Sequence, residues 1–154
     1  MSKPYFLETK KAKVNAAAYQ KHLSKQLLPN LDKIYPDRKY IFAQDGATSH
    51  TAKTTQEYLK ERLGKGGFLK STEWPPSSPD CNVLDYYFWN KLSGKVYEGR
   101  TTPFENVEML EKRIRQVWKS AIEMVEIRKA IQQFRRRLRA VVFSNGQPIK
   151  TLFK

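Results

Sequence analysis

A chain of 154 residues with 40% apolar side chains is long enough to fold as one compact domain with its own core. It has no apolar run of membrane-spanning length and no apolar signal segment at its start, and the single cysteine, Cys81, excludes an intramolecular disulfide and a cysteine-rich metal site. We therefore expect a protein of a reducing compartment, the cytosol or the nucleus, without a membrane partner.

The formal net charge of +14 is distributed unevenly. Lysine and arginine outnumber the acids by 9 to 3 over residues 1–44 and by 10 to 2 over residues 112–139, whereas residues 45–111 carry 8 basic and 10 acidic side chains. Basic flanks around an acidic region suggest a polyanionic partner, and nucleic acid is the first candidate. An arginine-rich helix face that meets only solvent is the alternative.

The first third of the chain predicts a short strand followed by a helix. Residues 4–8 are mostly apolar and can form the strand. Asn15 is typical of a helix N-cap, apolar residues recur at helical spacing from Tyr19 onward, and Pro29 is expected to kink or end that helix. His22 lies beside the apolar stripe, so a partly buried, non-catalytic role is favoured over a ligand role.

The next element is a predicted buried strand that ends in a carboxylate. Residues 40–43 are mostly apolar, Asp45 follows closely, and Gly46 breaks the run. A helix is expected over residues 52–63, because its apolar positions recur at helical spacing and glycines follow it. His50 stands near the start of this helix, where it can contact a ligand-holding group or a phosphate, or make a helix-start hydrogen bond.

A second carboxylate follows a rigid, proline-rich loop. Residues 68–72 predict a short strand, and the loop after them leads to a helix whose first turn carries Asp85. Asn82 and Asp85 also have the spacing of a capping box, so the acid can serve only the helix start. Asp80 directly follows a proline and is interpreted as a turn acid.

These two acids predict a cation site. A carboxylate at the carboxyl end of a strand and another in the first turn of a helix can face one crevice of an α/β sheet. Two carboxylates suit a hard, oxygen-seeking cation such as Mg²⁺. Asp45 and Asp85 are therefore the candidate catalytic and metal-binding residues.

The last third of the chain predicts two helices. Apolar residues keep one face over residues 107–121 and again over residues 124–141, with Trp118 at the edge of the first stripe, where it is expected to pack rather than to stack on a base. Asn145 and Gly146 predict a turn after the second helix. Several cations decorate that second helix and are candidates for contacts with phosphates: Arg128, Lys129, Arg135, Arg136, Arg137 and Arg139.

Two motifs together resemble a known family. QDGATSHTA, at residues 44–52, and WPPSSPDCNVLDYYFW, at residues 74–89, are similar to the two downstream catalytic blocks of Tc1/mariner-type transposases, and 39 residues separate Asp45 from Asp85. The similarity extends over almost the whole chain, including RRRLRAVVFSNGQPI near its end. The segment CNVLD departs from the family, which usually has a proline shortly before the acid.

The resemblance implies a ribonuclease-H-like α/β fold, a mixed sheet flanked by helices. Residues 1–99 would form a partial core that lacks its opening strands, and residues 100–154 a basic helical extension packed on it. In the family three acids hold two Mg²⁺ or Mn²⁺ ions, so Asp45 is expected to be the second acid and Asp85 the third. DNA is the implied partner, with a homodimer and a nuclear location as further expectations and no small-molecule cofactor.

The family's first acid and its N-terminal helix-turn-helix region have no counterpart in the sequence given. Glu8, Asp32 and Asp37 are the nearest upstream acids, and none lies in the expected strand. We therefore expect nucleic-acid binding with weak Mg²⁺ or Mn²⁺ affinity and no DNA cleavage by these residues alone. One alternative is a nuclease or strand transferase completed by another chain or an upstream exon. The other is a domesticated module that binds DNA or protein without metal.

Overall fold

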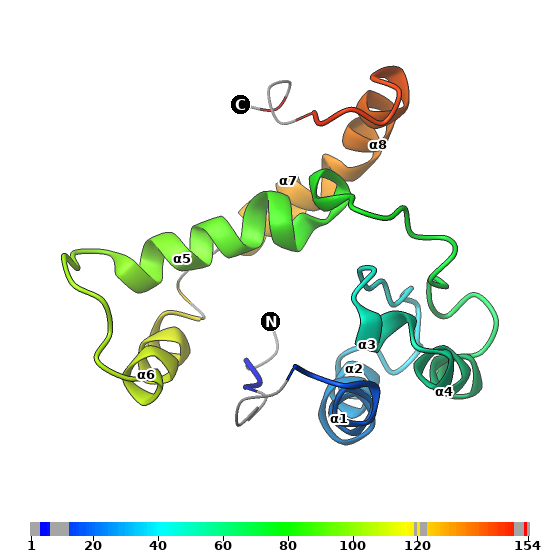
Figure 1. Cartoon of the computed structure of the whole chain (residues 1–154), viewed down its shortest axis with the longest axis horizontal. Helices are drawn as coiled ribbons and strands as arrows, with labels where there is room; N and C mark the ends of the chain where they lie inside the picture. Colours follow the sequence, from blue (N-terminus) through cyan, green and yellow to red (C-terminus); the bar gives the residue numbers. More distant parts are fainter. Residues whose placement is uncertain (1–3, 7–12, 119, 121–122, 150–152, 154) are drawn as a thin grey trace. The chain divides into compact units, whose positions relative to one another are not determined.

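A computed structural model describes residues 4–6, 13–118, 120, 123–149 and 153, and it divides the chain into two compact units (Figure 1). The first unit is Leu7–Ser77, and the second unit combines Met1–Phe6 with Ser78–Lys154. The domain boundary expected after residue 99 stays a prediction.

The first unit opens with a helical segment that Asn15 starts, as its sequence predicts. The Asn15 side chain accepts a hydrogen bond from the Ala18 amide at 2.9 Å and so caps α1, Ala16–His22. A π-helical turn, Leu23–Leu27, follows, and then α2, Leu28–Ile34. Pro29 does not end the helix: Leu27 and Leu28 before it keep helical dihedral angles, and α2 continues directly from the π-turn.

Two further helices complete the first unit. The short helix α3, Thr48–Thr51, is separated from α4, Lys53–Leu63, by the extended residue Ala52. Gly64 ends α4 with a positive φ of 74°, as the run of glycines predicts. Buried residues from α1, its π-turn, α2, α4 and the following segment form the core of this unit: Tyr19, Leu23, Leu28, Leu59 and Phe68.

The expected α/β fold is wrong for the residues that the structure describes, since they are helical and contain no β-strand. The predicted strands at residues 40–43 and 68–72 meet only at a single parallel bridge, Phe42 to Phe68. Its two hydrogen bonds run from the Phe42 amide to the Gly67 carbonyl and from the Leu69 amide to the Phe42 carbonyl, each 2.9 Å long. Two short segments that pair with each other alone are marginal as a sheet, because a stable sheet needs further strands.

The other predicted strand, at residues 4–8, is not formed where it can be followed. Residues 4–6 have no regular structure, and residues 7 and 8 lie outside the described residues. Residues 71–73 form a turn instead of continuing an extended segment, and the Glu73 amide donates to the Lys70 carbonyl at 2.9 Å. An apolar run therefore indicated burial correctly at Phe68 but not regular strand structure.

The second unit begins with a 3₁₀ turn, Pro79–Cys81, and a π-helical turn, Leu84–Phe88, that leads into α5, Trp89–Tyr97. The later helices are α6, Val107–Val117, α7, Met124–Gln132, and α8, Phe134–Phe143. Leu92, Val96 and Val117 are the buried centre of its core. Trp118 packs against this cluster, which confirms its predicted packing role. Over the described ranges, every helix is too short or too polar to cross a lipid bilayer.

Candidate functional site

Asp45 follows the bridge-forming segment of the first unit, and its carboxylate is held on one side. Its Oδ1 accepts a hydrogen bond from the Ala47 amide at 3.1 Å and lies 2.6 Å from His50 Nδ1. Because an ionised carboxylate only accepts hydrogen bonds, His50 Nδ1 must be the donor. Both contacts use Oδ1, and the Asp45 side chain is 51% exposed, so Oδ2 is the oxygen that can meet a cation.

A polar network fixes His50 in turn. The Tyr19 ring lies against the imidazole with 4.2 Å between ring centroids, and its hydroxyl donates to Gln44 Oε1 at 2.9 Å. Gln44 Nε2 and Gln56 Nε2 both donate to the His50 carbonyl, at 3.1 and 2.9 Å. Burial, and to a smaller degree the negative charge of Asp45, raises the pKa of Tyr19, so its hydroxyl stays protonated as a donor.

His50 thus contacts the candidate ligand Asp45, whereas whether Asp45 holds a cation and whether His50 also meets a phosphate stay predictions. Its spacing of five residues from Asp45 indicated proximity. The contacts of Tyr19, from the distant helix α1, and of Gln56, six residues after His50 in α4, were not predicted. Gln44 was the one available signal, because it directly precedes the acid. The Asp45 carboxylate is thus oriented by hydrogen bonds from His50 and from the Ala47 amide.

Asp85 lies in the second unit, in the π-helical turn Leu84–Phe88, and it is exposed. Such single π-turns are frequent at functional sites. The Asn82 side chain accepts from the Leu84 amide at 3.1 Å, while the Asn82 amide donates to the Pro79 carbonyl at 3.1 Å. The Asn82 side chain thus caps the turn through the Leu84 amide, and the interpretation of Asp85 as a capping-box acid stays open.

The remaining acids near these motifs have structural roles. Asp80 Oδ2 accepts from the Ile149 amide at 3.0 Å and ties the chain's end to the 3₁₀ turn. Asp32 forms ion pairs with Arg62 and with Arg38. Asp37 forms an ion pair with Lys39, and Glu8 lies outside the described residues. None of the described upstream acids is placed like Asp45, at the end of an extended segment.

A divalent cation fits the chemistry of the two candidate acids. Carboxylate oxygens are the ligands that Mg²⁺ and Mn²⁺ prefer, and Asp45 presents one to solvent. Asp45 belongs to the first unit and Asp85 to the second, and their convergence on one ion stays a prediction. Among the residues that the structure describes, no three His, Cys, Asp or Glu side chains gather into a group that could hold a metal.

The predicted phosphate-binding cations of α7 and α8 divide into two groups. Arg137 is buried, with 6% of its surface exposed, and its guanidinium lies 3.9 Å from the Tyr86 ring centroid and 4.4 Å from that of Phe153. Its Nη1 donates to the Asp80 carbonyl at 3.2 Å. Arg137 therefore packs the second unit, and its position three residues after Phe134, on the apolar stripe, was the signal that sequence reasoning overlooked.

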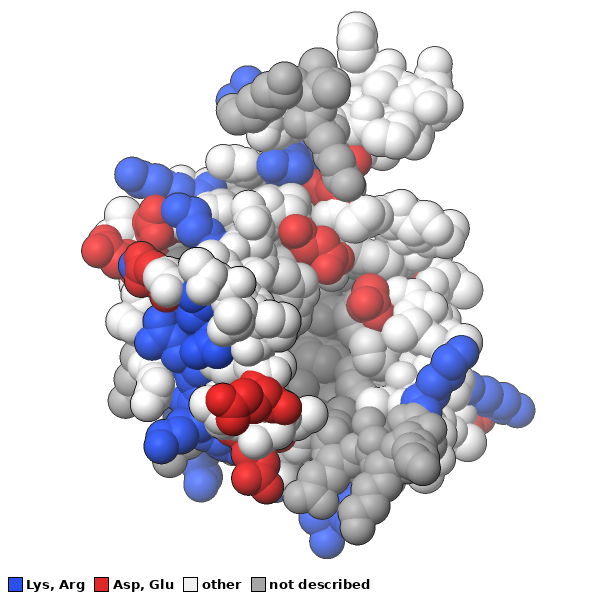
Figure 2. All heavy atoms as spheres, turned by 60° about the vertical axis from the view of Figure 1, so that its left-hand side comes forward, with Lys and Arg blue, Asp and Glu red and all other residues white. Residues whose placement is uncertain are grey.

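The other five predicted cations are exposed and remain available for a partner: Arg128, Lys129, Arg135, Arg136 and Arg139. Positive charge is not confined to these helices. On the face drawn in Figure 2, lysine and arginine side chains (blue) are interspersed with acidic ones (red). The five exposed cations of α7 and α8 are thus part of a wider distribution of positive charge on a chain of net charge +14.

Comparison with known proteins identifies the relatives. No protein-family model matches the chain. It is 31% identical to the Tc3 transposase and 28% identical to the Tc1 transposase of Caenorhabditis elegans, over 90% and 73% of its length. The crystal structure of the catalytic domain of Mos1 mariner transposase matches 90% of the chain with a TM-score of 0.72 and 26% identity. The chain is a homologue of the Tc1/mariner transposase catalytic domain.

This Tc1/mariner homologue spans about two fifths of the length of its curated relatives, 39% of the Tc3 transposase and 38% of the Tc1 transposase. It covers 65% of the Mos1 catalytic-domain structure. A second Mos1 structure, described as a paired end complex with Mn, has a TM-score of 0.71 over 90% of the chain at 24% identity. The resemblance read from the two motifs is confirmed.

Proposed function

We propose that residues 1–154 form the portion of a Tc1/mariner-type transposase catalytic domain that carries its second and third acids, Asp45 and Asp85, and that binds DNA. The observation that supports this most is the state of Asp45. Its Oδ1 is held by His50 and by a backbone amide, while the carboxylate remains half exposed. A carboxylate that is oriented by hydrogen bonds to one oxygen while the group stays accessible is typical of a metal ligand rather than of a surface acid.

Asp45 and Asp85 would hold Mg²⁺ or Mn²⁺ through their carboxylate oxygens. When bound, such ions activate a water or a 3′-hydroxyl and stabilise the leaving oxygen in phosphodiester chemistry. The chain's own contribution is to orient Asp45 through His50 and to present Asp85 from a π-turn. Two carboxylates provide less negative charge than three, so we expect weak affinity for the ions.

We expect residues 1–154 alone not to cleave or join DNA, because a nucleophile that is not fixed in position loses orders of magnitude in rate. The test is nicking of supercoiled plasmid in Mn²⁺ by the purified chain and by its Asp45→Ala variant. The expected result is no nicking above background with either protein. Nicking that disappears in Asp45→Ala would support instead an active nuclease, the alternative in which another chain completes the site.

DNA binding is expected to depend on the exposed cations of α7 and α8. Removing Arg135 and Arg139 together should weaken duplex binding and reduce the slope of log K against log salt by about two. Fluorescence anisotropy with a labelled duplex measures both quantities. If affinity is unchanged by EDTA and by Asp85→Ala, the metal-independent binding module is the better description. DNA as the partner places the protein in the nucleus in this proposal.

A further inference from the structure

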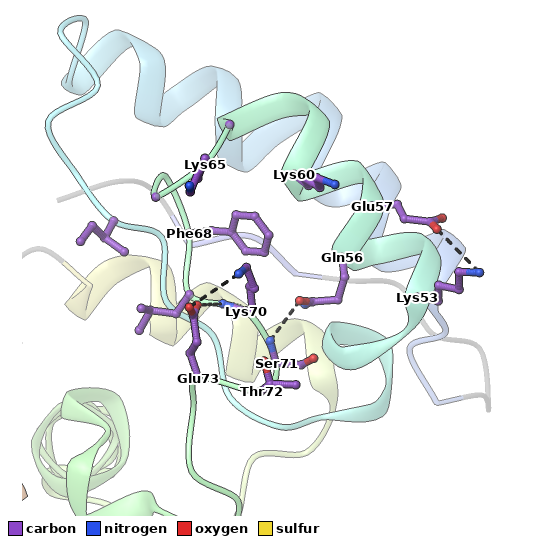
Figure 3. Close-up of a pocket in the computed structure, with 14 residues that line it drawn as sticks. Lys53, Gln56, Glu57, Lys60, Lys65, Phe68, Lys70, Ser71, Thr72 and Glu73 are labelled. Carbon is purple, nitrogen blue, oxygen red and sulfur yellow. Dashed lines mark hydrogen bonds and ion pairs between the residues drawn. The ribbon is translucent and has the colours of Figure 1, made fainter.

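A pocket of about 850 Å³ lies in the first unit, on the side of α4 that does not face the core (Figure 3). Residues one helical turn apart on α4 form one wall, the loop after Gly64 closes one end, and residues 68–73 form the opposite wall. Its volume is within the range of ligand-binding pockets. Neither Asp45 nor Asp85 lines it.

The pocket is apolar inside. Ile41 is 63% exposed although it is a large aliphatic residue, and Phe68 and Leu69 line the pocket beside it. Some polar groups of the wall are bonded within it. Gln56 accepts from the Ser71 amide at 3.0 Å and donates to a backbone carbonyl at 2.9 Å, and the Lys70 amide donates to the Glu73 carboxylate at 2.8 Å.

These internal hydrogen bonds decide which chemical group can enter. A nucleobase is recognised through hydrogen bonds to its edges, and the Gln56 side-chain amide and the Ser71 backbone amide are already bonded within the wall. An aliphatic or aromatic side chain needs no such partner and gains from the burial of apolar surface. The interior therefore fits an apolar anchor.

The rim of the pocket adds a charge requirement. Lys53 pairs with Glu57 at 3.9 Å on α4, and Lys70 pairs with Glu73 at 3.8 Å across the turn. Two further lysines line the pocket, and within the described part of the chain neither pairs with a carboxylate: Lys60 and Lys65. The two ion pairs are neutral, and the rim therefore keeps a net positive charge from Lys60 and Lys65.

We propose that this pocket binds an acidic peptide segment that carries a bulky apolar anchor. The anchor enters between α4 and residues 68–73, against Ile41, and spaced carboxylates of the peptide meet Lys60 and Lys65. An apolar anchor covers Ile41, which a phosphate backbone with one charge per nucleotide would leave exposed. The site is separate from the metal and DNA functions proposed above and gives the first unit a protein partner.

The test uses a fluorescein-labelled peptide of eight residues in which a leucine–phenylalanine pair is flanked by glutamates. Anisotropy titrations at about 0.15 M salt suppress contacts that depend on net charge alone. We expect Lys60→Glu/Lys65→Glu to weaken binding about tenfold, because two attractions become repulsions. The matched control is Lys21→Glu/Lys33→Glu, which makes the same charge change on exposed positions of α1 and α2 and should alter affinity less than about twofold.

Three further measurements complete the design. A peptide with serines in place of leucine and phenylalanine should bind at least about tenfold more weakly, and Ile41→Ser should weaken binding of the original peptide. Asp45→Ala should leave the peptide affinity unchanged, so that failure of the metal proposal and failure of this one can be told apart. Circular dichroism checks that each variant keeps its helices.

Three results would each overturn the proposal. Equal losses in the two lysine double variants would mean that binding follows net charge, and undiminished binding of the serine peptide would remove the anchor. Displacement of the peptide by a single-stranded oligothymidine whose own binding is lost in Lys60→Glu/Lys65→Glu would assign the pocket to nucleic acid.

Discussion

Arg137 provides a prediction that separates a structural arginine from the DNA-binding arginines around it. It stands in a run of basic residues, yet its guanidinium is buried between the rings of Tyr86 and Phe153 and donates to the Asp80 carbonyl. Arg137→Ala would remove these contacts and leave that carbonyl without its donor. Arg139→Ala, on the exposed side of the same helix, removes a cation without such contacts.

The expected loss can be estimated from those contacts. A hydrogen bond from a charged group to a partly buried carbonyl contributes about 1.5 kcal/mol, and each cation–π contact about 0.5 kcal/mol or more when partly desolvated. Arg137→Ala should therefore lower the free energy of unfolding by about 2–3 kcal/mol. For a chain of this length that corresponds to a decrease of roughly 5–10 °C in Tm.

Urea unfolding followed by far-ultraviolet circular dichroism measures this difference, with Arg139→Ala as the matched control. Arg139→Ala should unfold within about 0.5 kcal/mol of the wild type and should weaken DNA binding more than Arg137→Ala does at temperatures where both are folded. Equal unfolding midpoints for the two variants, or a loss of DNA affinity in Arg137→Ala without a loss of stability, would refute the structural role.

Three further predictions follow from the first unit. Burial raises the pKa of Tyr19, so its phenol ionises at lower pH in the unfolded chain than in the folded one. The contribution of this group to the free energy of unfolding is complete below about pH 10 and is lost as the pH rises further. In urea unfolding measured between about pH 8 and pH 11, Tyr19→Phe should therefore lose less stability with rising pH than the wild type does. A Cβ at position 67 would overlap the Leu63 carbonyl oxygen, so Gly67→Ala should cost about 1–3 kcal/mol in thermal unfolding, and an unchanged Tm would contradict that packing. His50→Ala should weaken Mn²⁺ binding about tenfold, measured by electron paramagnetic resonance of the free ion, whereas His50→Asn, which keeps a donor for Asp45, should recover part of the loss.

The helices were predictable where the signal was local. Asn15 starts α1 as expected, and the predicted helix that follows Asp85 buries Leu92 and Val96 in the core of the second unit. Capping and helical periodicity depend on residues within one or two turns, so the local sequence is sufficient to predict where these helices start and which face is buried. The same reasoning found the turn at Asn145, whose φ is positive.

The strands were not predictable in the same way. Residues 40–43 have the apolar pattern of a buried strand, yet Ile41 is 63% exposed and only Phe42 forms a bridge. A strand is stabilised by neighbours on its edges, and local sequence does not specify whether those neighbours are present.

Side-chain geometry at the candidate site was predictable only in part. The short spacing between Asp45 and His50 indicated contact, but the ring of Tyr19 that fixes the imidazole comes from a separate helix. Arg137 was assigned to the surface because arginines are mostly exposed, and its burial follows from its phase on α8 relative to Phe134. Both features depend on packing between elements, which residue type alone does not reveal.

The central claim is that Asp45 and Asp85 hold the same cation, and a double-mutant cycle for Mn²⁺ binding tests it most directly. Electron paramagnetic resonance titrations of the wild type, Asp45→Ala, Asp85→Ala and the double variant give the four affinities. If both carboxylates bind one ion, each single substitution should weaken binding about tenfold or more, and the double variant should be little weaker than either. Losses that multiply independently, or a single substitution that leaves Mn²⁺ affinity unchanged, would contradict the shared site.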